Sequence, residues 1–248
     1  MTTLARIDDL HISFGGVAAA SGVSFTVNTA EFLAVIGPNG AGKTTALRMV
    51  AGILKPDSGR VFFDDRDVTA LPTHARVRLG LGFTHQIVRP FYSFSTVENV
   101  MIAAGHDLTR SPWRALGHRS RAAAKEKAAT ILARIGLADQ ADKSPRALPL
   151  GQRKRLEVAR AIALDPKLLL LDEPLAGLSS AEAATMADLI RTLPAQGITV
   201  VLVEHNLGEV LRVADRLVVL DAGKVLAEGV PAEVMKRADV RQAYTGVV

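Results

Sequence analysis

The stretch Gly37-Pro38-Asn39-Gly40-Ala41-Gly42-Lys43-Thr44-Thr45 matches the pattern G-x-x-x-x-G-K-[ST] of a phosphate-binding P-loop. The apolar residues 32–36 before it predict a buried strand, and residues 46–50 after it predict a helix. Glycines let backbone N–H groups close around an anion, and a helix N-terminus adds unpaired donors and the positive end of a dipole. Lys43 would supply a charge to the outer phosphates, and Thr44 a hydroxyl to Mg²⁺. The sequence therefore predicts that these nine residues bind a nucleoside triphosphate.

A second motif, an apolar run that ends in two carboxylates, narrows the chemistry. Residues 168–171 are four leucines, which predict a strand buried on both faces of a parallel sheet. Asp172 and Glu173 follow at the carboxyl end of this strand, where ligands bind in open α/β sheets. Asp172 is placed to hold Mg²⁺ through water, and Glu173 to orient or deprotonate an attacking water. An acidic turn that merely closes a strand is the alternative, and the P-loop upstream argues against it.

Two further predicted strands lead to polar side chains. Residues 81–84 precede Gln86, a candidate ligand of Mg²⁺ and of the attacking water. Residues 199–203 precede His205, a candidate contact of the γ-phosphate. A polar residue at one strand end is usually only solvated. Four strands that deliver functional candidates to one edge of a sheet are harder to explain by chance.

In order and spacing, these motifs resemble those of the ATP-binding cassette (ABC) ATPases, over essentially the whole chain. The family's order is Walker A (37–45), Q-loop (Gln86), signature region (148–152), Walker B (168–173) and switch histidine (His205). The resemblance implies an α/β P-loop NTPase fold. We therefore expect a mainly parallel core sheet, an N-terminal antiparallel β region and a helical subdomain.

The resemblance also implies roles for individual residues. It implies that hydrolysis uses Lys43, Gln86, Glu173 and His205, and that Mg²⁺ is held by Thr44, Gln86 and Asp172. Gly151 and Gln152 would contact nucleotide bound by a second subunit. An aromatic residue at the position of Phe14 stacks on adenine in the family, so we favour that role over a place in the core.

Within the family, the chain looks most like the ATPases of branched-chain amino acid importers. The stretches that carry this finer match are 13–16, 86–91, 151–160, 174–178 and 240–244. The signature region departs from the usual Leu-Ser-Gly-Gly-Gln, because Pro149 and Leu150 replace Ser-Gly, and proline offers neither a hydroxyl nor an N–H. Ser179 stands where an Asp is common. Both changes concern support for a partner's site.

Length and composition fit one large α/β domain. We expect residues 1–86 and 151–248 to form the core and residues 87–150 the helical subdomain. The spacings Ser95-Thr96-Val97-Glu98 and Ser179-Ser180-Ala181-Glu182 predict capping boxes, and residues 119–135 predict a helix that stops at Gly136. Arg153-Lys154-Arg155 is interpreted as an exposed helix face.

Composition also limits the function classes. The 248 residues contain no cysteine, no apolar run of about 20 residues and no apolar N-terminal segment typical of a signal peptide. A net charge of +5 suits phosphate ligands and an anionic membrane face, whereas 4% aromatic residues argue against nucleic-acid stacking. We expect a peripheral protein on the cytoplasmic side of the inner or plasma membrane.

The sequence thus predicts an ATPase subunit that binds ATP and Mg²⁺ and drives transport, with import of branched-chain amino acids as the favoured process. The resemblance implies a second ATP-binding subunit, identical or different, two transmembrane permease subunits and, indirectly, a solute-binding protein. Alternatives are an importer of urea or another amide, a lipid exporter, or a non-transport ABC ATPase of DNA repair or translation. Repair versions carry long coiled-coil heptads, and translation versions usually hold two cassettes; neither is present here.

Overall fold

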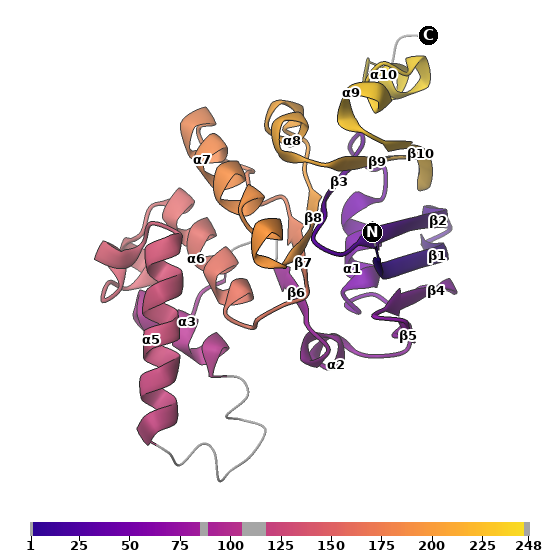
Figure 1. Ribbon diagram of the computed structural model, residues 1–248. Helices are drawn as coiled ribbons and strands as arrows, with labels where there is room; N and C mark the ends of the chain where they lie inside the picture. Colours follow the sequence, from indigo (N-terminus) through magenta and orange to yellow (C-terminus); the bar gives the residue numbers. More distant parts are fainter. Residues whose placement is uncertain (1, 85–88, 106–117, 246–248) are drawn as a thin grey trace.

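The fold is built around a six-stranded sheet in the computed structural model, which describes residues 2–84, 89–105 and 118–245 (Figure 1). The strand order is β10-β9-β3-β8-β7-β6, with β9, β3, β8, β7 and β6 parallel and β10 antiparallel to β9. The strands are β3 (Phe32–Ile36), β6 (Leu81–Thr84), β7 (Leu168–Asp172), β8 (Thr199–Val203), β9 (Arg216–Asp221) and β10 (Lys224–Gly229). The predicted parallel core sheet is confirmed.

A second sheet is antiparallel and comes from the N-terminal part of the chain. Its order is β2-β1-β4-β5, and its strands are β1 (Thr3–Phe14), β2 (Val17–Asn28), β4 (Ser58–Phe63) and β5 (Arg66–Asp67). Helix α1 (Lys43–Val50) shares one apolar core with residues of both sheets. This arrangement confirms the predicted antiparallel β region and ties the P-loop helix to both sheets.

The central sheet is buried on both faces, as the leucine run predicts. Side chains alternate along a strand, so Leu168 and Leu170 enter the core that contains α1. Leu169 and Leu171 enter the core on the opposite face, which contains residues of the later helices. All four leucines are fully buried. The sheet is therefore a rigid support for whatever follows its carboxyl ends.

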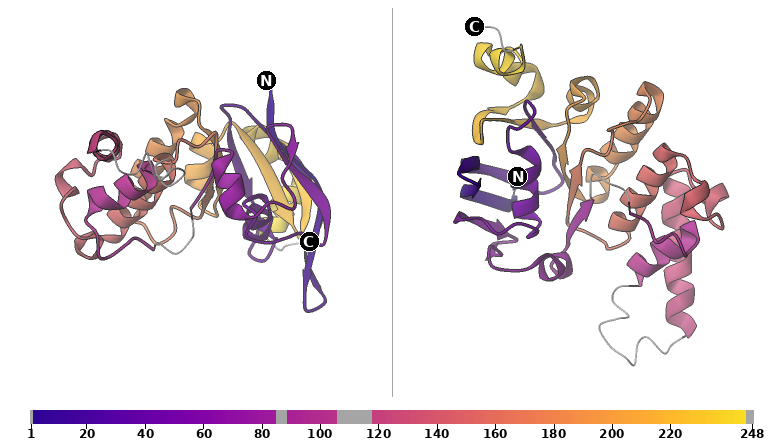
Figure 2. Two further views of the ribbon diagram at one scale, coloured as in Figure 1. Left: turned by 90° about the horizontal axis from the view of Figure 1, so that it is seen from below. Right: turned by 180° about the vertical axis from the view of Figure 1, so that it is seen from behind.

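Helices α3 (Thr96–Ala104), α5 (His118–Arg134) and α6 (Leu150–Ile162) gather on the side of the molecule away from the antiparallel sheet (Figures 1 and 2). The other helices of the described residues are α2 (Thr73–Arg78), α7 (Ser180–Arg191), α8 (Leu207–Val213), α9 (Pro231–Val234) and α10 (Ala238–Thr245), with short 3₁₀ turns at Ala138–Gln140, Pro145–Ala147 and Pro194–Gln196. Within the described part of the chain, none of the helices is both long and apolar enough to cross a membrane.

Both predicted capping boxes are present. The Ser95 side chain accepts from the Glu98 N–H at the start of α3, and the Ser179 side chain accepts from the Glu182 N–H at the start of α7. Helix α5 begins one residue before the expected start. Gly136 follows it with φ 67°, the left-handed conformation that commonly ends a helix.

Candidate functional site

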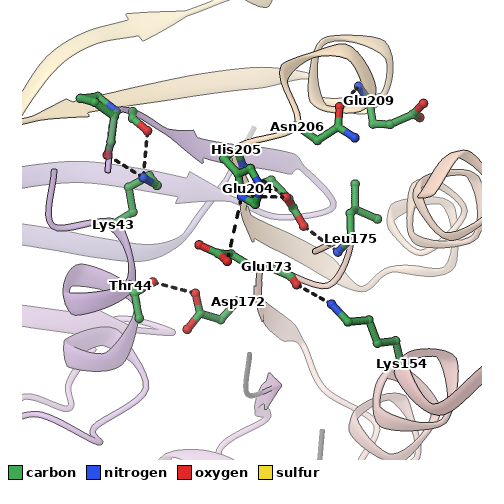
Figure 3. A network of polar contacts seen from close by, with 12 residues as sticks. Lys43, Thr44, Lys154, Asp172, Glu173, Leu175, Glu204, His205, Asn206 and Glu209 are labelled. Carbon is green, nitrogen blue, oxygen red and sulfur yellow. Dashed lines mark hydrogen bonds and ion pairs between the residues drawn. The ribbon is translucent and has the colours of Figure 1, made fainter. Parts of the chain in front are cut away.

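The sequence-predicted site residues converge on one edge of the central sheet. Strands β3, β8, β7 and β6 are adjacent and parallel, so their carboxyl ends share that edge. The P-loop follows β3, Glu173 follows β7 and His205 lies two residues beyond β8 (Figure 3). The candidate Gln86, beyond β6, lies outside the described residues and stays a prediction.

The P-loop has glycine where the chain passes close to other backbone. A Cβ at Gly37, whose φ is 149°, would lie 2.0 Å from the Leu220 carbonyl oxygen. A Cβ at Gly42, whose φ is 93°, would lie 2.2 Å from the Ala19 carbonyl oxygen. Side chains are therefore excluded at both positions, and the loop can close into a compact turn ahead of α1.

Lys43 lies inside the turn of this loop. Its ammonium group donates to the carbonyl oxygens of Gly37 and Pro38, both at 2.8 Å. Burial lowers the pKa of Lys43, although the nearby carboxylates of Glu173 and Asp172 act in the opposite direction. A cation held at the N-terminus of α1, beside backbone N–H groups, is suited to bind phosphate oxygens.

A small cavity of about 200 Å³ lies against the P-loop. Its lining consists of Ala19, Asn39, Gly40, Ala41, Gly42, Lys43, Thr44, Thr45 and Glu173. At its edge the Thr44 hydroxyl donates to Oδ1 of the buried Asp172 at 2.9 Å. A hydroxyl beside a carboxylate is the hard-oxygen donor set that Mg²⁺ prefers. The cavity thus combines groups that fit both the phosphates and the metal of Mg·ATP.

Glu173 reaches the cavity through an unusual backbone conformation. Its φ of 50° lies in the left-handed region, which is uncommon for a residue with a side chain. The Glu173 N–H donates to the Val203 carbonyl at 2.9 Å, which anchors the turn to β8. Its carboxylate Oε2 lies 4.0 Å from Nδ1 of His205. The predicted pair Glu173 and His205 is therefore brought together beside the cavity.

Two buried charged residues at this edge were missed by the sequence reasoning. Lys154 was expected on an exposed helix face, but it is only 6% exposed and donates to the Glu173 carbonyl oxygen at 3.0 Å. Its spacing to Gly151 and Val158, which are also buried, follows one face of α6 and could have revealed this. Burial lowers the pKa of Lys154.

Glu204 is the second missed residue. It is fully buried at the end of β8, and its carboxylate accepts from the Leu175 N–H at 2.6 Å and the His205 N–H at 3.1 Å. Burial raises the pKa of Glu204, which these hydrogen bonds oppose. The sequence signal was a polar pair at a strand end, as at Asp172 and Glu173.

Three predicted nucleotide contacts lie elsewhere. Phe14, at the end of β1, is 50% exposed, which excludes the alternative that it is a core residue. Gly151 and Gln152 lie in the first turn of α6, which begins after Pro149. None of the three lines the 200 Å³ cavity. Their roles stay predictions, and those of Gly151 and Gln152 require a second subunit.

Comparisons with known proteins identify the family of the chain. A model of the ABC transporter family matches residues 20–176. The lipopolysaccharide export system ATP-binding protein LptB of Acidithiobacillus ferridurans is 37% identical over 246 residues, 99% of this chain and 98% of that protein. The high-affinity branched-chain amino acid transport ATP-binding protein LivG of Escherichia coli (strain K12) is 34% identical over 249 residues, 98% of each chain.

A solved structure extends the similarity to three dimensions. The ADP conformation of MJ1267, an ATP-binding cassette of an ABC transporter, matches with a TM-score of 0.87 and 31% identity over 100% of both chains. The family model spans more than half of the chain, and the relatives match over nearly its whole length. These matches accompany a P-loop and two carboxylates at one sheet edge. The chain therefore belongs to the ABC transporter family and is an ATPase subunit.

Proposed function

We propose that this ATPase hydrolyses ATP with Glu173 as general base and His205 as a contact of the γ-phosphate. The observation that carries the proposal is the meeting of Lys43, Thr44, Asp172 and Glu173 at one cavity edge. Phosphoryl transfer needs little covalent help from protein, so positioning and charge neutralisation supply the catalysis. Mg²⁺, held by Thr44, Asp172 and the predicted ligand Gln86, would neutralise phosphate charge.

We propose import of branched-chain amino acids as the process that hydrolysis drives. The support is the resemblance of the stretches 13–16, 86–91, 151–160, 174–178 and 240–244 to ATPases of such importers, together with relatives that carry the LivG name. A second candidate is lipid export, because a relative named LptB is similar to a comparable degree.

The partners we propose are a second ATP-binding subunit, two permease subunits at the cytoplasmic membrane face and, through them, a solute-binding protein. An aromatic cluster, defined as Phe91, Tyr92 and Phe94 in the loop before α3, is a suitable docking surface because all three side chains are exposed and the rings of Phe91 and Phe94 meet edge to face. The fully buried Asn99 holds this loop: its amide accepts from the Phe91 N–H and donates to the Phe91 carbonyl. A nucleic-acid partner is not proposed.

We propose that the two ATP sites of the assembly are unequal when the second subunit is a different chain. Pro149 forms the N-cap of α6 and donates no N–H there, and Leu150 is exposed at its first turn. A partner with Ser and Gly at these positions would complete this chain's own site better than an identical copy would. We expect the isolated chain to hydrolyse ATP slowly. The rate should rise when the partner is added, and it should also rise in the variant that carries Pro149→Ser with Leu150→Gly.

Transport itself tests the proposed process. The chain and its co-purifying membrane subunits would be reconstituted in vesicles with the matching solute-binding protein. We expect ATP-dependent uptake of labelled leucine, isoleucine or valine. ATP-dependent lipid extraction or urea uptake, with no uptake of these amino acids, would replace the proposed substrate and leave the ATPase assignment intact.

A further inference from the structure

A buried lysine links helix α6 to the backbone of the candidate general base. The Lys154 side chain is 6% exposed, and its ammonium group donates to the carbonyl oxygen of Glu173 at 3.0 Å (Figure 3). The bond goes to the main chain, so it fixes the position of the residue without neutralising the carboxylate directly. A buried ammonium group requires such hydrogen bonds to offset its desolvation.

A buried glutamate holds the same turn from the other side. The two oxygens of Glu204 accept from the N–H of Leu175, two residues after Glu173, and from the N–H of His205. Glu204 therefore ties the segment after β7 to the segment after β8. These are the segments that carry the candidate base and the switch histidine.

The turn needs this support because of its conformation. Glu173 has φ 50°, and a non-glycine residue persists in the left-handed region when its surroundings determine its conformation. Its N–H is bonded to the Val203 carbonyl, and its own carbonyl is bonded to Lys154. Lys154 thus contacts the Glu173 carbonyl, and Glu204 contacts the N–H of Leu175, two residues further along the same turn.

We propose that Lys154 and Glu204 are positioning residues that set the orientation of the Glu173 carboxylate toward the attacking water. The inference rests on the proposed role of Glu173 as general base. Lys154 lies about one helical turn inside α6, and the first three residues of this helix belong to the signature region 148–152. The hydrogen bond from Lys154 to the Glu173 carbonyl therefore links α6 to the turn that carries the candidate base in the same subunit.

The test uses the full-length chain with its co-purifying subunits. Lys154→Met removes the donor and keeps the length of the side chain, whereas Lys154→Arg keeps a donor. Lys127→Met is the matched control, because Lys127 also donates to a main-chain carbonyl, that of Ala163, at 2.9 Å, but away from the cavity. The measurements are kcat, KM, affinity for a fluorescent ATP analogue, and the melting temperature.

We expect Lys154→Met to lower kcat by about 10- to 100-fold, because a small misplacement of a reacting group has effects of this size. ATP affinity should stay as in the wild type, since Lys154 does not line the cavity. Lys154→Arg should recover part of the lost kcat, and Lys127→Met should keep the wild-type kcat.

A double-mutant comparison separates positioning from general destabilisation. If Lys154 acts through Glu173, Lys154→Met should cause no further loss in a Glu173→Gln background. Glu204→Gln replaces one of the two acceptor oxygens and should also lower kcat while ATP affinity is retained. If Lys154→Met does not fold, this variant tests the positioning role instead. An unchanged kcat in a folded variant, an equal loss in the Glu173→Gln background, or a loss confined to ATP affinity would overturn the inference. Unchanged hydrolysis in Glu173→Gln alone would instead overturn the proposed base.

Discussion

Phe14 stands at the last position of β1, paired with Val17 across the turn that leads into β2. Half of its surface is exposed, so its ring contributes little to the core and is accessible to a ligand. Any base can stack on an aromatic side chain, so such a contact depends mainly on the presence of the ring.

Phe14→Ala should therefore reduce ATP affinity by about 1–3 kcal/mol, the usual size of a base–aromatic contact, with little change in melting temperature. Titration with a fluorescent ATP analogue beside a melting curve measures both. Phe94→Ala is a suitable control, because Phe94 is also an exposed aromatic residue but lies in the loop before α3 instead of at the end of β1. Equal affinities for Phe14→Ala and wild type would remove Phe14 from the site.

At the scale of elements, the start of α7 explains one departure from the family pattern. The Ser179 hydroxyl donates to Oε2 of Glu182 at 2.7 Å, and the Ser179 N–H donates to the same oxygen at 3.0 Å. An aspartate at this position could not donate from its side chain and would face Glu182 with a like charge. Ser179 thus caps α7 and also donates a side-chain hydrogen bond to Glu182, which an aspartate could not do.

Ser179→Ala should lower the free energy of unfolding by about 1 kcal/mol, and Ser179→Thr should retain most of it, because threonine can also cap a helix. Denaturant melts at several pH values measure this. The hydrogen bond from Ser179 lowers the pKa of Glu182, so its contribution is present above the unfolded-state pKa and is lost as the pH falls through the folded-state pKa. Acid sensitivity that is identical in wild type and Ser179→Ala would contradict this account.

Individual elements also show which parts of the structure could be predicted from the sequence. The strand at 168–172 and both capping boxes could be predicted because their patterns are local. The burial of Lys154 was signalled by its spacing to Gly151 and Val158 on one face of α6. Its contact with the Glu173 carbonyl could not be predicted, because it joins residues that are distant in sequence. The order β3-β8-β7-β6 also depends on such long-range pairing, although the resemblance to a family supplied the fold class.

At the scale of the whole molecule, the C-terminal helix returns to the main core. Tyr244 of α10 packs against the core cluster that includes Ala34 and Ile36 of β3, the strand that leads into the P-loop. Burial raises the pKa of its phenol from 10.0 to about 12. The folded state therefore holds this proton more tightly than the unfolded state does.

Between pH 10 and about 12 the unfolded state releases the Tyr244 proton first, so stability should fall with rising pH. The loss should be roughly 1–2 kcal/mol after allowance for partial exposure, and Tyr244→Phe should lack it. Urea melts across this range measure the difference. Tyr92→Phe removes the chain's other phenol as a control, and a change like that of Tyr244→Phe in this variant would contradict the assignment.

The proposed hydrolysis depends on the carboxylate of Glu173, which follows β7 and would act on water beside the P-loop. Its most direct test is the rate of ATP hydrolysis by Glu173→Gln, measured with ATP binding on the same preparation. Glu209→Gln serves as a control on α8, and Lys43→Ala should weaken nucleotide binding itself. We predict that Glu173→Gln binds ATP as the wild type does while hydrolysis falls by ~10²-fold or more. Equal hydrolysis rates in wild type and Glu173→Gln would contradict the account.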